Sequence, residues 1–206
     1  MVEYIEPTEN EVQNHNNLMF GMIERYVDSC EGQGQIWLFD YDGTLADAGF
    51  QSQEEVDLFL NLATQNGWDC EVAQRASALH WYDSIGKYST RMLVHSVIPD
   101  LIEGIEQSGG LCIGLTNNAM QVGDSISKFL GISLGKNEPF KYFSSHFQSK
   151  REIIEEILTM VGDAQIQINF VDNELRNVES VHQINNPNVK AIWIDSPEKF
   201  HELNSN

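Results

Sequence analysis

Two carboxylates, Asp40 and Asp42, follow a run of apolar residues near the start of the chain. The stretch from residue 35 to residue 45 reads Gln-Ile-Trp-Leu-Phe-Asp-Tyr-Asp-Gly-Thr-Leu, which is typical of a buried strand that ends in a turn. Acids spaced in this way at the carboxyl edge of an open α/β sheet point into the crevice where ligands bind. Such a pair can hold Mg²⁺, because water and substrate phosphate complete its coordination. The alternative is an ordinary turn, since Asp, Gly and Thr are common turn formers.

Two more polar residues stand at the ends of later apolar runs. Thr116 ends the second predicted strand, where its hydroxyl could bind an anion beside unpaired helix N–H groups or could simply cap the next helix. Asp172 ends a further predicted strand and is followed by Asn173. The carboxyl ends of parallel strands meet at one edge of a sheet, so we expect Thr116 and Asp172 near the first acid pair.

A lysine opens the helical pattern that follows residue 149. The helix dipole disfavours a cation at this position, so Lys150 indicates a compensating anion nearby. Arg151 is a rival for the same role, and a plain surface pair is the alternative.

These four elements, in this order, resemble the motifs of the haloacid dehalogenase superfamily of phosphohydrolases. The Asp-Tyr-Asp-Gly-Thr-Leu stretch that begins at Asp40 carries the strongest likeness, and the four elements together span residues 36 to 177. The chain is most similar to small bacterial members whose substrates are poorly defined. The resemblance implies an α/β fold with a doubly wound, mainly parallel sheet and a small helical cap inserted after the first strand.

The resemblance also implies a role for each catalytic candidate. Asp40 is expected to attack phosphorus and form an aspartyl-phosphate, while Asp42 protonates the leaving group and later activates water. Thr116 and Lys150 are expected to hold the phosphoryl oxygens, so that charge on the transferred group is neutralised.

Mg²⁺ is the implied cofactor, bound by Asp40, the backbone carbonyl of Asp42 and Asp172. The superfamily often carries two acids in tandem at the last position, whereas this chain has Asn173 after Asp172. Asn173 can offer a neutral oxygen, or Asn173 or Glu174 can act through water. Asn177, one helical turn further on, is expected to steady the ligands.

The elements that must position these residues follow from hydrophobic periodicity. Strands are predicted at 35–39, 111–116, 166–171 and 189–194. Helices are predicted at 10–30, 56–66, 70–82, 90–107 with a fresh start at Pro99, 119–130, 150–158, 175–181 and 196–203. The segment 131–149 is predicted to be irregular, because it is rich in Gly, Ser, Asn and aromatic residues.

About sixty residues separate the first two strands, although a βαβ crossover needs only a dozen or more. The interpretation is a core formed by 1–48 and 106–206, with 49–105 inserted as a helical cap over the carboxyl edge of the sheet. Aromatic and basic residues gather in this insertion and form either its own small core or a lid over the substrate; they are His80, Trp81, Tyr82, Lys87, Tyr88 and Arg91.

Composition restricts the class of partner. The 206 residues include 12 Lys or Arg and 31 Asp or Glu, for a formal net charge of −19, which argues against nucleic acid and anionic membranes as partners. Cys30, Cys70 and Cys112 form no Cys-x-x-Cys motif and no zinc site is indicated, which favours a reducing compartment. The first residues lack the pattern of a signal peptide and no apolar run reaches ~18 residues, so we expect a cytoplasmic protein or one exported without a cleaved signal.

The function expected from these observations is Mg²⁺-dependent hydrolysis of a small phosphorylated metabolite. The alternatives are a protein phosphatase of the same superfamily, or a binding or regulatory protein that keeps the fold with little turnover. Asn173 is the sequence feature that points to the last alternative. The sequence does not indicate an oligomeric state.

Overall fold

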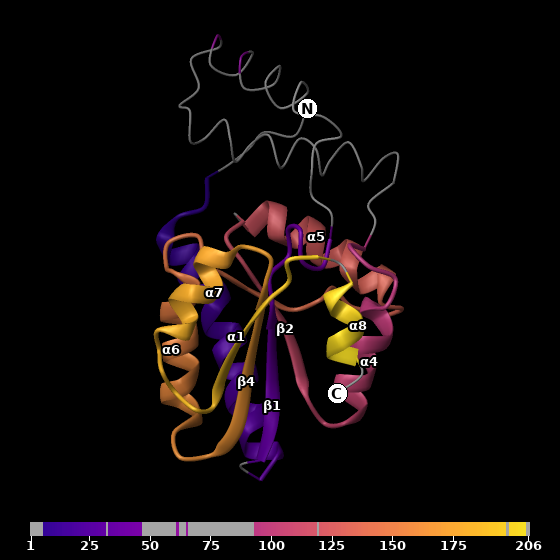
Figure 1. Cartoon of the computed structure of the whole chain (residues 1–206). Coiled ribbons are helices and arrows are strands. Elements are labelled where there is room, and N and C mark those ends of the chain that lie inside the picture. The colour runs from indigo at the N-terminus through magenta and orange to yellow at the C-terminus, as the bar shows by residue number, and fades with distance from the viewer. Residues whose placement is uncertain are drawn as a thin grey trace.

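A five-stranded parallel sheet lies between two layers of helices (Figure 1). The computed structural model describes residues 6–31, 33–46, 61, 65, 93–118, 120–196 and 198–204. Apart from residues 61 and 65, which are helical, the expected helices at 56–66 and 70–82 lie outside the described residues. The aromatic and basic residues from His80 to Arg91 lie outside them as well.

The strand order places the first strand at the centre of the sheet. The strands are β1 (Gln33–Phe39), β2 (Leu111–Thr116), β3 (Tyr142–Ser144), β4 (Gln165–Asp172) and β5 (Val189–Trp193), and their order is β3-β2-β1-β4-β5. The chain builds outward from β1 through β2 to β3, and then returns to the other side of β1 for β4 and β5. The direction of winding reverses between β1 and β4, and in open α/β sheets ligands bind beyond the strand ends at such a point.

Helices cover both faces of the sheet, as a parallel sheet requires. One layer consists of α1 (Glu9–Ser29), α6 (Lys150–Val161) and α7 (Leu175–His182), whose buried side chains share a core cluster with Ile36 and Leu38. The other consists of α4 (Ile98–Gln107), α5 (Met120–Ser133) and α8 (Lys199–Asn204), which pack with Phe39. Figure 1 shows α1, α6 and α7 on one side of the sheet and α4 and α8 on the other. In the described residues, every helix is too short or too polar to cross a lipid bilayer.

Strand β1 explains why an apolar run without alternation predicts a central strand. Ile36 and Leu38 face the α1/α6/α7 layer and Phe39 faces the α4/α5/α8 layer, and all three are fully buried. Full burial of such a side chain contributes about 1.5–3 kcal/mol to the free energy of unfolding, so both faces of β1 help to fix it in the centre.

The predicted core elements are present, with shifted ends and one correction. The segment 131–149, predicted to be irregular, contains β3, whose three residues pair with β2 from Gly114↔Tyr142 to Thr116↔Ser144. A strand of three residues is too short to show a period, and its burial on both faces comes from tertiary packing. Helix α4 begins at Ile98, beside Pro99 as predicted, whereas α8 begins at Lys199, three residues later than predicted.

The chain leaves and re-enters the described core at one place. Ala46 forms an antiparallel bridge with Leu93, and the backbone N–H of Val94 donates to the carbonyl of Leu45 at 3.1 Å. Residues 46 and 93 therefore lie side by side just beyond the carboxyl end of β1.

Candidate functional site

The ends of β1 and β4 bring two acids together. The register pairs Phe39 with Val171, and the backbone N–H of Asp40 donates to the carbonyl of Val171 at 2.9 Å. The two residues that come next, Asp40 and Asp172, therefore lie at the same level of the sheet. Asp40 is 6% exposed and Asp172 is fully buried.

Lys150 lies between these two carboxylates. Its Nζ donates to Asp40 Oδ1 at 2.5 Å and to Asp172 Oδ2 at 2.7 Å. Ser149 caps α6 in a reciprocal arrangement with Glu152, and this cap fixes the point at which the lysine leaves the first turn. Arg151 pairs instead with Glu155 at 2.8 Å, so of the two rival cations it is Lys150 that reaches the strand ends.

Burial and like charge both act on the ionisation of this cluster. Burial raises the pKa of Asp40 to about 7; Lys150 opposes this rise, while the charges of Asp172 and Asp42 add to it. Burial lowers the pKa of Lys150, but Asp40 and Asp172 raise it by more, so this pKa lies above its ordinary value. The lysine therefore remains an ammonium ion.

The turn after Asp40 is closely packed on both sides. Tyr41 is fully buried, and its ring packs against Gly114 of β2 so closely that a Cβ there would lie 2.2 Å from a ring carbon. Gly43 has φ +74°, and a Cβ on it would lie 2.4 Å from Asn173 Nδ2. A residue other than glycine would therefore be strained at position 43 and would collide with the end of β4.

Thr116 and Asp42 are joined by an asparagine that was not predicted as a site residue. Nδ2 of Asn118 donates to Thr116 Oγ1 at 3.0 Å and also to Asp42 Oδ2. The backbone N–H of Asn118 donates to the same hydroxyl oxygen at 3.2 Å. Its position just beyond a strand that ends in Thr116 is the sequence signal that could have identified it.

Asp172 is held on both oxygens. Oδ1 accepts from the backbone N–H of Glu174 at 2.7 Å, and Oδ2 accepts from Asn177 Nδ2 at 3.0 Å in addition to Lys150. Asn177 thus lies where an orienting residue was predicted. The side chain of Glu174 pairs with Arg176 at the surface.

Asn173 is tied to the turn that follows β1. Its backbone N–H donates to Thr44 Oγ1 at 3.0 Å, and the Thr44 hydroxyl donates to Asn173 Oδ1 at 3.2 Å. Thr44, which is fully buried, therefore links the two strand ends and is a second residue that the sequence reasoning did not assign to the site. Its signal is its place directly after the Asp-x-Asp-Gly turn.

The donor chemistry at β1 and β4 suits Mg²⁺. Asp40 and Asp172 share one ammonium, and the described residues offer no hydrogen bond to Asp40 Oδ2. Two carboxylates are sufficient for Mg²⁺, which takes its other ligands from water and phosphate. In the described part of the chain, no three His, Cys, Asp or Glu side chains form a group that could hold an ion by themselves. The fit is therefore to a hydrated ion that a substrate completes.

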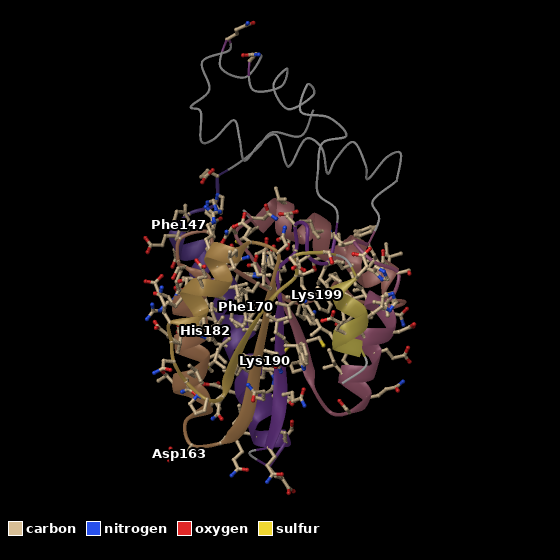
Figure 2. All side chains as sticks on the ribbon, viewed as in Figure 1. Phe147, Asp163, Phe170, His182, Lys190 and Lys199 are labelled. Atoms are coloured by element: carbon tan, nitrogen blue, oxygen red, sulfur yellow. The ribbon has the colours of Figure 1, made fainter. Side chains whose placement is uncertain are left out.

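A cavity of about 480 Å³ opens beside Lys150. It is lined by residues 145–150 together with Asn117, Arg176 and Asn177. Phe147 on its wall is 48% exposed, and Figure 2 shows this side chain at the carboxyl end of the sheet, opposite Asp163. The cavity leaves room for a small molecule next to the lysine.

Comparison of the chain with protein-family models, with curated proteins and with solved structures returned no match.

Proposed function

We propose that this protein is a Mg²⁺-dependent phosphomonoester hydrolase of the haloacid dehalogenase type, acting through an aspartyl-phosphate on a small phosphorylated metabolite. The observation that carries the proposal is the arrangement of Asp40, Lys150 and Asp172, which lie within hydrogen-bond distance at the point where the winding of the sheet reverses. Asp42 and Thr116 lie at the same edge, on the β2 side of β1. Asn173 follows Asp172 and contacts Thr44 at this edge, so all six catalytic and metal candidates lie at one edge of one sheet.

The first chemical step uses the Asp40 oxygen that Lys150 does not contact. Asp40 Oδ2 attacks phosphorus, the bond from phosphorus to the leaving oxygen breaks, and Asp42 gives that oxygen a proton. Lys150 on Oδ1 favours the ionised form of Asp40 against the cost of burial and orients the carboxylate. The hydroxyl of Thr116 supports a phosphoryl oxygen.

The second step restores the enzyme. Asp42 takes a proton from water, the water oxygen attacks phosphorus, and the bond from phosphorus to Asp40 Oδ2 breaks to release inorganic phosphate. When bound by Asp40 and Asp172, Mg²⁺ would supply positive charge to the phosphoryl group in both steps.

The resembled fold also includes a cap inserted after the first strand. The bridge between Ala46 and Leu93 supports an insertion, because the segment between them starts and ends at the same point beside Asp40.

The test is hydrolysis of p-nitrophenyl phosphate by the purified protein. We expect release of p-nitrophenol with Mg²⁺, its loss with EDTA, and a fall of at least about 10³-fold in Asp40→Asn with an unchanged circular dichroism spectrum. The matched control is Asp163→Asn, an exposed acid at the opposite end of the sheet, which should retain parent activity.

Near-normal turnover by Asp40→Asn would contradict the nucleophile assignment. Phosphate binding without any turnover in the parent protein would favour the regulatory alternative, for which Asn173 is the sequence feature. Activity on phosphopeptides in preference to a panel of phosphorylated metabolites would favour a protein phosphatase.

A further inference from the structure

We propose that Asn118 is a positioning residue that holds the carboxylate of Asp42, and that helix α1 supports it through Asn16 and Ser144. This inference rests on the proposed function, because it concerns the proton donor of the first step. It assigns a catalytic consequence to a helix that precedes every residue of the resembled motifs.

The contact with Asp42 uses both protons of one amide. Asn118 Nδ2 donates one N–H to Asp42 Oδ2 and the other to Thr116 Oγ1. An amide with both N–H groups engaged has a single orientation, so the bond to Oδ2 also fixes the direction of the second carboxylate oxygen. A general acid must lie within hydrogen-bond reach of the leaving oxygen, and a carboxylate that rotates spends less time there.

Asn118 is itself held from β3. The hydroxyl of Ser144, the last residue of β3, donates to the backbone carbonyl of Asn118 at 3.2 Å. Ser144 is fully buried, so this contact anchors the loop after β2 to the edge of the sheet.

Helix α1 holds Ser144 in turn. Asn16 is 1% exposed, and its Oδ1 accepts from the Ser144 N–H at 3.0 Å while its Nδ2 donates to the Ser144 carbonyl at 2.8 Å. A side-chain amide carries the same donor and acceptor as a peptide group, so Asn16 pairs with the edge strand as a further strand would. His15 adds a contact at 2.8 Å to the carbonyl of Tyr142.

Substrates with different leaving groups distinguish a misplaced Asp42 from a general loss of structure. p-Nitrophenolate leaves with little help from an acid, whereas the alkoxide of a simple alkyl phosphate needs a proton as the bond breaks. The value of kcat/KM reports the steps up to the breaking of that bond. A misplaced Asp42 therefore lowers kcat/KM for an alkyl phosphate more than for p-nitrophenyl phosphate.

The expected result for Asn118→Ala is a fall in kcat/KM of about 10- to 100-fold for n-butyl phosphate, the range that loss of one hydrogen bond to a charged group produces. For p-nitrophenyl phosphate we expect a fall of less than about 5-fold, due to the lost contact with Thr116. Asn118→Gln keeps the amide protons and should recover part of the n-butyl phosphate activity. Asn16→Ala should change the ratio of the two substrates in the same direction but by less.

Asn17→Ala is the matched control, because Asn17 is exposed on α1 and bonds only within the helix, to Gln13, in the contacts described. It should leave the substrate ratio unchanged. Equal losses on both substrates in Asn118→Ala would overturn the inference, whereas an inactive parent protein would overturn the proposed function.

A spectroscopic measurement tests the contact between Asn118 and Asp42 independently of catalytic activity. In protein labelled with ¹⁵N at asparagine, Asp42→Ala should shift the side-chain NH₂ signals of Asn118, and Asn16→Ala should shift them too. Unchanged Asn118 signals in Asp42→Ala would overturn the inference whatever the activity.

Discussion

The two sides of β1 hold their acids by different chemistry. On the β4 side, Asp40 and Asp172 share the ammonium of Lys150, and all three side chains are almost completely buried. On the β2 side, Asp42 accepts from the neutral amide of Asn118, which also donates to Thr116. In the described residues, the acids on one side contact an ammonium ion, and Asp42 on the other side contacts a neutral amide.

The difference matches the separate tasks that the proposed mechanism gives to the two acids. A nucleophile must be ionised when it attacks, and an ammonium ion stabilises only the ionised form. An acid that gives away and regains a proton in each cycle would be hindered by an ammonium in contact, since that contact favours one of its two states. A neutral amide orients the carboxylate without adding a charge.

The largest effect is expected from removal of the ammonium. Lys150→Met leaves Asp40 and Asp172 buried beside each other, which should lower the free energy of unfolding by about 3–5 kcal/mol and abolish activity. The control Lys141→Met breaks an exposed pair with Glu138 and should cost less than about 1 kcal/mol. Urea denaturation of both variants measures the difference.

A double variant tests the reason for that loss. Adding Asp40→Asn to Lys150→Met removes one of the two like charges that repel each other. This should restore part of the lost stability. No recovery would mean that the cost comes from packing of the lysine stem and not from charge.

The next effect concerns the metal and distinguishes the two residues at the end of β4. Asp172→Ala should raise the Mg²⁺ concentration needed for half-maximal activity by more than about 100-fold, or abolish activity, because it removes a charged ligand. Asn173→Ala should raise it by less than about 10-fold, the effect of an orienting neighbour, since Asn173 Oδ1 already accepts from Thr44. Equal shifts in magnesium titrations of the two variants would contradict the assignment of Asp172 as the direct ligand.

The smallest expected effect is a change in the free energy of unfolding with pH, caused by the ionisation of Asp40. The pKa of Asp40 is raised from 3.8 to about 7 by burial, so between these values the folded protein holds a proton that the unfolded chain has released. The resulting stabilisation is complete below pH 3.8 and is lost as the pH rises to about 7.

Asp40→Asn removes this dependence. In EDTA, the free energy of unfolding of the parent minus that of Asp40→Asn should fall by about 1–3 kcal/mol between pH 4.5 and 7.5. Urea denaturation at four pH values measures it. A difference that rises with pH would show that the ion pair with Lys150 outweighs burial.

Strong apolar runs made most of the core predictable. The residues from Ile36 to Phe39 and from Leu111 to Leu115 predict strands because they are buried on both faces, as β1 and β2 are. Strand β3 was not predicted, because three residues show no period and its edge is completed by the side chain of Asn16 in a distant helix. Of the predicted cap at 49–105, residues 98–105 belong to α4, which packs against the sheet. The remainder stays a prediction.

In the site, residues at strand ends were predictable and residues that connect them were not. Asp40, Thr116 and Asp172 each end an apolar run, and parallel strands bring such ends together. Asn118 and Thr44 act through contacts with residues far along the chain, which periodicity does not encode. Asn16 could have been identified from the sequence, because it is a polar residue on the buried stripe of α1.

The central place of β1 also governs when the site can exist during synthesis. Strand β1 is made first, yet its seven-residue pairing is with β4, from Gln33↔Gln165 to Phe39↔Val171. Lys150 and Asp172 likewise leave the ribosome long after Asp40. A growing chain can join β1 to β2 and β3, but Asp40 then faces an open sheet edge with neither its cation nor its neighbouring acid. Translation therefore produces Asp40 well before Lys150 and Asp172, so an unfinished chain carries the proposed nucleophile without the two groups that the proposed mechanism requires.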